Sequence, residues 1–300
     1  MISLPRNKLA RTWLGLTPAY VVIGVFMLIP ILLMVVISFL EANPYGGVYF
    51  NFSTEAYVQL LFEYDLADNL VYNPVYLNII LRSIMLSAVA TAVCLALGFP
   101  VAYFITLQPK SRRNFYIYLI TIPFWTNLLV RTFAWILILG RNGVIEMPLL
   151  ALGIIDDSLN MMYTNGAITV GLAYSYLPLM VLPIYASLER LDFRLIEAAS
   201  DLYASRLAIM TKVVIPLSLP GIIAGCTLVY IPSLGAFIAP DLLGGGKRLL
   251  LGSLVQFQFA TARNWPFGAA IAMVLLAFVV ISLMVFARSA RKRAQMEGAP

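Results

Sequence analysis

The chain has 300 residues, of which 61% are hydrophobic and 11% are charged. Soluble domains are about 45–50% apolar and about 25% charged, so this composition excludes a water-soluble domain and predicts one membrane domain over residues 1–300. The formal net charge is +6 and histidine is absent. Without histidine, the commonest neutral-pH acid–base group and metal ligand is missing, so we expect neither a catalytic residue nor a metal site.

Six apolar runs are long enough to cross a bilayer, for which about 20 residues suffice. They cover residues 14–40, 76–107, 115–140, 167–188, 213–234 and 266–286. The first run is too long for the apolar core of a signal peptide. Residues 41–73 are polar and predict an ordered loop, and residues 189–212 form a second long polar segment. The expected fold class is therefore an all-α membrane protein with six transmembrane helices.

Lysine and arginine divide unevenly between the two sides of these predicted spans, with fourteen on one side and six on the other. The larger group is Arg6, Lys8, Arg11, Lys110, Arg112, Arg113, Arg190, Arg194, Arg206, Lys212, Arg288, Arg291, Lys292 and Arg293. Cytoplasmic segments of membrane proteins carry the excess of basic residues, so both termini are predicted to be cytoplasmic. The same bias accounts for the net positive charge, and we expect no nucleic-acid partner.

The polar segment 189–212 contains a short amphipathic pattern. Leu195, Ala199 and Leu202 recur at helical spacing on one face, and Glu197 and Asp201 lie four residues apart on another. This spacing predicts a short helix outside the membrane. Its small and acidic residues suit docking to another protein, whereas its leucine face equally suits a helix lying on the bilayer surface.

This segment resembles the EAA loop of permease subunits of binding-protein-dependent ABC importers. Glu-Ala-Ala at 197–199 is followed 18 residues after Glu197 by Ile215-Pro216, and then by Pro220-Gly221-Ile222. In that family the loop forms a coupling helix that seats on the ATPase subunit. The resemblance implies the type I ABC importer permease fold, with a core over about residues 75–285. It also implies ATPase-coupling contacts at Glu197, Ala198, Ala199, Asp201, Leu202 and Tyr203.

Tyr203 departs from the pattern, because the family usually has glycine at this position. Glycine permits a positive φ that bulky residues adopt with difficulty. We therefore expect a local difference in the loop geometry or in its fit to the ATPase.

Longer segments resemble spermidine/putrescine permeases. They are Ile122–Trp135, Tyr176–Tyr185, Gly235–Gly245 and Asn264–Ala270. A path for a polycation needs carboxylates and aromatic faces. The candidate path residues are Trp125, Asn127, Tyr174, Tyr176, Tyr230, Phe237 and Asp241. Each aromatic residue also fits a lipid-facing belt or helix packing, and Asp241 also fits the cap of a turn. Some members of the resembled family have an acidic residue where this chain has Ala236.

The resemblance implies that this chain binds no cofactor, and that ATP and magnesium belong to a partner ATP-binding cassette dimer. A second homologous permease subunit, a periplasmic polyamine-binding protein and the lipid bilayer of the bacterial inner membrane are the other expected partners. Gly244–Lys247 does not form a P-loop, because the pattern needs glycine at Asp241 and serine or threonine at Arg248. Alternative cargoes are ferric iron, thiamine, phosphonate or another small amine. A secondary carrier is a further alternative, although we find no internal repeat.

Two further features, a pair of glycines and an arginine within a predicted span, each fit two structural roles. Gly221 and Gly225 form a small-xxx-small pair that permits close helix approach, either to a second subunit or within this chain. Arg131 lies within a predicted span, where a cation is costly and would repel a cationic cargo. We therefore expect it in a structural pair or extended towards the interface.

Overall fold

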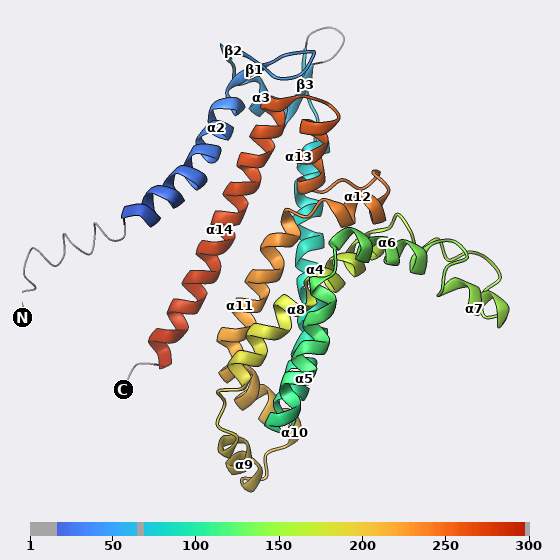
Figure 1. The fold of residues 1–300 in the computed structure, drawn as a ribbon, viewed down its shortest axis with the longest axis vertical. Helices are drawn as coiled ribbons and strands as arrows, with labels where there is room; N and C mark the ends of the chain where they lie inside the picture. The colour runs from blue at the N-terminus through green and yellow to red at the C-terminus, as the bar shows by residue number, and fades with distance from the viewer. Residues whose placement is uncertain (1–16, 65–68, 298–300) are drawn as a thin grey trace, which may run out of the picture. The chain divides into compact units, whose positions relative to one another are not determined.

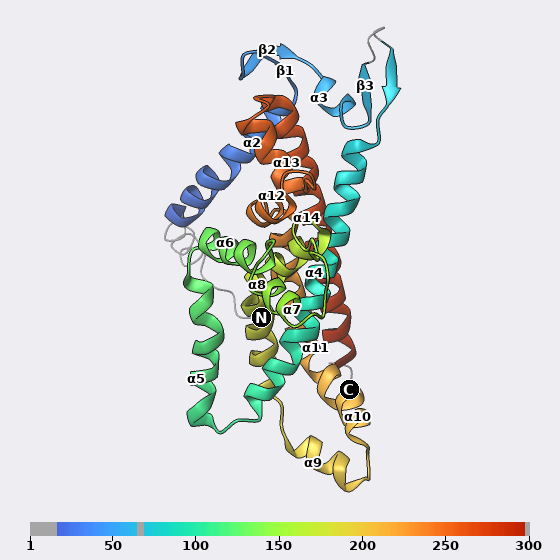
Figure 2. The ribbon, with the colours of Figure 1, turned by 90° about the vertical axis from the view of Figure 1, so that its right-hand side faces the viewer.

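The computed structural model describes residues 17–64 and 69–297, with side chains described up to residue 288 (Figures 1 and 2). The chain divides into two compact units. The first contains the described residues up to Pro74 together with Val255–Val274, and the second contains Val75–Leu254 and the chain from Leu275 onward. Among the described residues, five helices are long and apolar enough to span a membrane, and a bent helix pair makes a sixth if it counts as one span. The predicted helical membrane fold is confirmed, and the described residues add two short β-hairpins to it.

The first unit begins with a membrane-length helix over Thr17–Ser38, which contains a π-helical segment η1 (Gly24–Leu28) and α2 (Ile29–Ser38). Residues 14–16 of the predicted span lie outside the described residues. The predicted ordered loop contains two antiparallel hairpins and a short helix: β1 (Leu40–Ala42) with β2 (Val48–Phe52), α3 (Glu55–Val58), and β3 (Phe62–Tyr64) with β4 (Leu70–Tyr72). Glu41 pairs with Tyr49 in the first hairpin.

The second unit holds the helices that carry the predicted site. They are α4 (Val75–Thr106), α5 (Lys110–Thr121), the 3-10 turn η2 (Ile122–Trp125), α6 (Leu128–Leu139), α7 (Glu146–Ala151), α8 (Asn165–Leu188), α9 (Arg194–Asp201), α10 (Arg206–Ile209), η3 (Met210–Val214), α11 (Ile215–Leu234) and α12 (Ile238–Gly244). Along the chain, α13 (Leu251–Ala260) and α14 (Trp265–Glu297) each continue across a boundary between the units.

Helices α4, α8 and α11 form the centre of the second unit. Cys94 and Ala102 of α4, Met180 and Ile184 of α8, and Val229 of α11 are buried together in one core. Buried residues of α4 recur every three or four positions, which is the helical spacing of a single packed face. Cys94 and Cys226 are both free cysteines.

Gly221 and Gly225 let α11 lie directly against α8. A Cβ atom at Gly221 would lie 2.5 Å from the carbonyl oxygen of Pro183, and one at Gly225 would lie 2.8 Å from the sulfur of Met180. Neither position has room for a larger side chain without a shift of the neighbouring helix. Of the two alternatives for the small-xxx-small pair, the structure therefore has packing within the chain.

The third predicted span, residues 115–140, is not one straight helix. The helical segment Lys110–Trp125, which comprises α5 and η2, meets α6 at an angle of 91° across residues 126–127. Pro123 cannot donate a backbone hydrogen bond, and Asn127 starts α6 by accepting a 2.8 Å hydrogen bond from the amide of Leu129. The apolar run predicted a span correctly in composition, but a proline and an N-cap divide it into two helices.

Glu146 organises the loop between α6 and α8. The carboxylate is buried and accepts hydrogen bonds from the backbone amides of Asn142 (2.7 Å) and Leu159 (2.9 Å). Leu159 lies 13 residues after Glu146 in the sequence. The neighbouring Ser158 hydroxyl and these two amides lower the pKa of Glu146 below its ordinary value of 4.5, although burial acts in the opposite direction. One charged side chain thus closes both ends of the loop.

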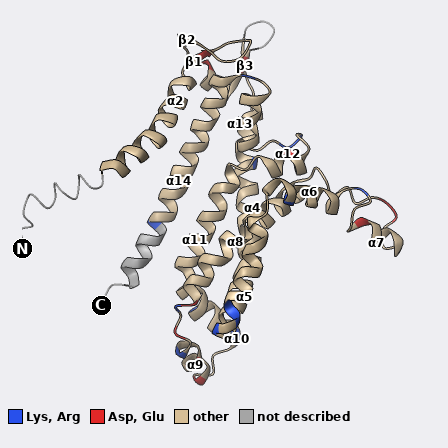
Figure 3. Ribbon diagram, viewed as in Figure 1, with Lys and Arg blue, Asp and Glu red and all other residues tan. Residues whose placement is uncertain are grey.

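Lysine and arginine residues occur together at the end of the second unit that carries α5, α9 and α10 (Figure 3). They include Lys110, Arg112, Arg113, Arg190, Arg194, Arg206 and Lys212. The basic residues before residue 17 lie outside the described residues. This clustering agrees with the uneven distribution in the sequence, and the cytoplasmic orientation of this end stays a prediction.

Candidate functional site

The predicted amphipathic helix is α9, which lies beyond the ends of α8 and α11 in both views (Figures 1 and 2). The side chain of Asp192 starts the helix by accepting a 3.0 Å hydrogen bond from the amide of Arg194. Ile196 is half-buried and packs against the core that joins α4, α8 and α11. The helix is therefore anchored along one side and open on the other.

Five of the six predicted coupling residues are exposed on α9 and at its end. We call this group the coupling surface: Glu197, Ala198, Asp201, Leu202 and Tyr203. Ala199, the sixth, is half-buried, and its carbonyl oxygen accepts a hydrogen bond at the end of the helix. Leu202 is 82% exposed and Tyr203 is 98% exposed. Two large apolar side chains thus stand in the open beside two carboxylates, which is the composition of a contact surface.

Tyr203 adopts a left-handed backbone conformation with φ of 56°. Its amide donates to the carbonyl of Ser200 (2.9 Å), and the amide of Ala204 donates to the carbonyl of Ala199 (3.1 Å). This pair of bonds is the Schellman motif that ends many helices, in which glycine usually takes the left-handed position. Tyr203 thus adopts the backbone conformation that glycine favours. Compared with the glycine of the family pattern, tyrosine adds backbone strain and an exposed ring at this position.

Two of the predicted path residues line one cavity. Tyr176 of α8 and Phe237, at the start of α12, lie around a cavity of about 130 Å³ together with Leu128, Gly235 and Ala236. The Tyr176 hydroxyl donates a 3.4 Å hydrogen bond to the carbonyl of Pro232. None of the residues lining this cavity is charged. Ala236 therefore occupies a position where an acidic side chain would put a carboxylate into the cavity.

The other predicted path residues do not line this cavity. Trp125 is 83% exposed in η2, and Asn127 caps α6. The ring of Tyr174 packs edge-on against Trp135 at 5.6 Å between ring centroids. Tyr230 and Asp241 also lie outside this cavity. The ring of Tyr230 packs on that of Phe286, and Asp241 is exposed in the first turn of α12. The aromatic pairs agree with the helix-packing alternative.

Arg131 stacks on an aromatic ring. Its guanidinium carbon lies 5.6 Å from the ring centroid of Phe124, on the other side of the break between α5 and α6. This is the structural pair that its position in an apolar segment predicts. Among the described residues, no group of three histidine, cysteine, aspartate or glutamate side chains could hold a metal ion.

Sequence reasoning missed a polar cluster at the base of the helices. Arg113 of α5 and Glu189, which follows α8, lie 76 positions apart in the sequence, yet their side chains form an ion pair. Arg113 belongs to the uneven distribution of basic residues, and Glu189 belongs to no motif in the sequence. The turn after α4 and the return of the chain along α8 bring the two residues together. No local sequence pattern therefore predicts their contact.

Comparison with known proteins identifies the family. Residues 95–294 match the family described as binding-protein-dependent transport system inner membrane component. The chain belongs to this family. It is 38% identical over 275 residues to the spermidine/putrescine transport system permease protein PotB of Escherichia coli, covering 91% of this chain and 96% of that protein. It is also 35% identical over 264 residues to the protein of the same name from Haemophilus influenzae, covering 88% of each.

The fold is also found in solved ABC transporters. A chain of a bacterial ABC transporter involved in the import of the acidic polysaccharide alginate matches with a TM-score of 0.71 at 13% identity, covering 95% of this chain and 98% of that one. At this identity the likeness shows the fold alone, which is that of type I ABC importer permeases. A permease subunit of this kind is a transport component and not itself an enzyme.

Proposed function

We propose that this chain is the permease subunit of an ATP-driven importer that carries spermidine and putrescine into the bacterial cytoplasm. The observation that carries this proposal is the similarity along about nine tenths of the chain to permeases of spermidine/putrescine transport systems. Membership of the binding-protein-dependent family supports a periplasmic polyamine-binding protein as the source of cargo. In addition, a transporter of the same fold has been solved in complex with a ligand-bound periplasmic protein.

The coupling surface on α9 docks on a partner ATP-binding cassette dimer, which binds ATP and magnesium. Three observations support this role: α9 lies beyond the ends of α8 and α11, its inner side is anchored through Ile196, and its open side combines carboxylates with Leu202 and Tyr203. A helix lying on the bilayer would instead bury Leu195 and Ile196 in lipid. Because Ile196 already packs against protein, docking is favoured over the bilayer alternative.

Cargo passes the cavity lined by Tyr176 and Phe237. Its volume of about 130 Å³ is below the roughly 300–1,000 Å³ of complete small-molecule sites. One ammonium group fits this half-site, and a second homologous permease subunit supplies the facing wall. Because the lining has no carboxylate, ring faces and carbonyl oxygens carry the attraction for the cation, at about 0.5–2 kcal/mol for each ring.

The coupling assignment is tested by reversing one charge on α9. Glu197→Arg leaves the permease inserted in the membrane, and it abolishes ATP-driven uptake because the coupling surface no longer fits its partner. The matched control is Asp157→Arg, which reverses an exposed carboxylate in the loop between α7 and α8. Wild-type uptake by the Glu197→Arg complex would show that this helix does not dock on the ATPase.

A further inference from the structure

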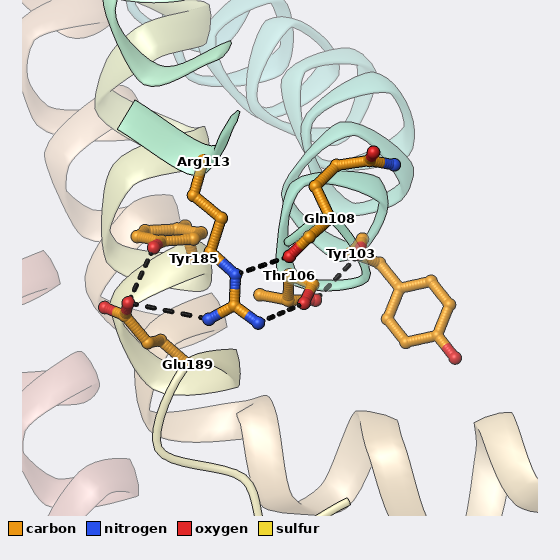
Figure 4. Close-up of polar contacts among 6 residues, drawn as sticks. All are labelled: Tyr103, Thr106, Gln108, Arg113, Tyr185 and Glu189. Carbon is orange, nitrogen blue, oxygen red and sulfur yellow. Dashed lines mark hydrogen bonds and ion pairs between the residues drawn. The ribbon is translucent and has the colours of Figure 1, made fainter. Parts of the chain in front are cut away.

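The guanidinium of Arg113 joins the ends of three helices (Figure 4). Its Nε donates to the carbonyl oxygen of Gln108 and its Nη2 donates to that of Thr106, both at 2.8 Å. Its Nη1 lies 3.7 Å from Oε1 of Glu189. Arg113 belongs to the first turn of α5, Thr106 is the last residue of α4, Gln108 lies in the turn between these helices, and Glu189 directly follows α8.

The two carbonyl contacts explain why an arginine suits this position. Thr106 ends α4, where the last carbonyl groups have no partner within the helix and a nearby cation complements the helix dipole, while the Gln108 carbonyl belongs to the turn that follows. The forked guanidinium reaches both carbonyls and still presents a third nitrogen to Glu189. A lysine ammonium is a compact point charge and cannot reproduce this arrangement.

The ion pair has one sheltered and one open partner. The Arg113 side chain is 14% exposed, whereas that of Glu189 is 49% exposed. Oε1 of Glu189 also accepts a 2.7 Å hydrogen bond from the hydroxyl of Tyr185, which fixes the carboxylate against the last turn of α8. A movement of the last turn of α8 is therefore transmitted to Arg113 through the Glu189 carboxylate, which is hydrogen-bonded to Tyr185.

Glu189 is connected to α9 by a short, hydrogen-bonded turn. The amide of Leu191 donates to the carbonyl of Leu188 at 3.1 Å, and Asp192 accepts from the amides of Arg194 and Leu195 through its side chain and its carbonyl. These hydrogen bonds restrain the turn, so we expect a displacement of α9 to move Glu189 with it. Beyond Arg113, α5 leads to the break before α6, whose first residue lines the Tyr176 cavity.

We infer that Arg113 is a positioning residue for energy coupling. Through Glu189 it transmits movement of α9 to the ends of α4 and α5, and from α5 to the cavity wall. This role rests on the proposed docking of α9 on an ATPase. Loss of Arg113 would leave the coupling surface intact and would separate ATP hydrolysis from opening of the path.

The test measures labelled spermidine taken up per ATP hydrolysed by the reconstituted complex. Arg113→Gln lowers this ratio about tenfold, while ATP hydrolysis stays within about twofold of wild type, because charge-assisted contacts are lost only in the transmitting element. Arg113→Lys does not restore the ratio. Glu189→Gln keeps the carbonyl contacts and lowers the ratio about threefold. The matched control Arg112→Gln, an exposed neighbour on α5, leaves it unchanged.

A second readout does not depend on the cargo. A cysteine at Leu128 is labelled with a thiol reagent before and after the ATPase is trapped with vanadate, in a background lacking Cys94 and Cys226. Trapping changes the labelling rate in the wild-type arrangement, and Arg113→Gln abolishes that change. If Arg113→Gln does not insert, the same comparison with Glu189→Gln decides.

Two results would overturn the inference: an unchanged ratio in both Arg113→Gln and Glu189→Gln, or a parallel fall in uptake and ATP hydrolysis, which marks a purely structural role. Failure of the proposed docking of α9 looks different. In that case Glu197→Arg leaves uptake at the wild-type rate, whatever the Arg113 variants do. Loss of uptake in Glu197→Arg together with an unchanged ratio in the Arg113 variants refutes only the positioning role.

Discussion

Tyr203 permits a substitution that separates backbone strain from side-chain contact. A non-glycine residue in the left-handed conformation is destabilised by about 1–2 kcal/mol, and glycine recovers only part of this because it has more freedom in the unfolded chain. Tyr203→Gly is therefore expected to stabilise the end of α9 by about 1 kcal/mol, or about a fivefold shift in its opening equilibrium. Tyr203→Ala removes the same ring and keeps the strain.

The assay is hydrogen exchange at the amide of Ala204. This amide donates a hydrogen bond to the carbonyl of Ala199, and the hydrogen bond breaks when this turn opens. Exchange slows about fivefold in Tyr203→Gly and does not slow in Tyr203→Ala. Uptake falls in both variants, because both lose the 98% exposed ring from the coupling surface. Equal exchange rates in the two variants would refute the strain argument, and wild-type uptake in both would refute the contact.

Three further outcomes follow from the geometry. Tyr176→Leu raises the KM for spermidine about two- to thirtyfold by removing a ring face, whereas Tyr176→Phe keeps the ring and stays within about twofold; equal KM values in the two variants would contradict the cavity assignment. Gly221→Ala lowers the free energy of unfolding in detergent by about 1–3 kcal/mol, because its Cβ would lie 2.5 Å from a carbonyl oxygen of α8. Gly166→Ala, with only an ordinary contact, serves as its control. Glu146→Gln increases proteolysis of the loop between α6 and α8 at neutral pH; because folding lowers the pKa of Glu146, the stabilisation is present above pH 4.5 and is lost as pH falls through the lowered pKa. A difference between Glu146→Gln and wild type that persists at lower pH would assign the effect to packing.

Composition and periodicity predicted the helices well, because a bilayer requires long apolar runs. The predicted span 167–188 differs from α8 by two residues at its start. The amphipathic spacing around Glu197 likewise predicted α9. In both cases the signal is local, and the physical requirement acts on consecutive residues.

Features that depend on distant contacts were not predictable in the same way. Pro123 is a local helix-breaking residue before the bend between α5 and α6, but no local sequence pattern specifies the 91° angle. Seven aromatic and polar residues were equally good path candidates in the sequence, and the structure brings only Tyr176 and Phe237 to one cavity. The contact of Arg113 with Glu189 had no sequence signal, since either residue alone fits a solvated cytoplasmic charge.

The most direct test of the proposed function is ATP-driven uptake by proteoliposomes that contain this permease, its second permease subunit, the ATPase and the periplasmic binding protein. Labelled spermidine, putrescine and ferric iron are compared at equal concentrations, with and without ATP. We predict ATP-dependent accumulation of at least one of the two amines and none of iron. Accumulation of iron, or of neither amine while the complex hydrolyses ATP, would contradict the account.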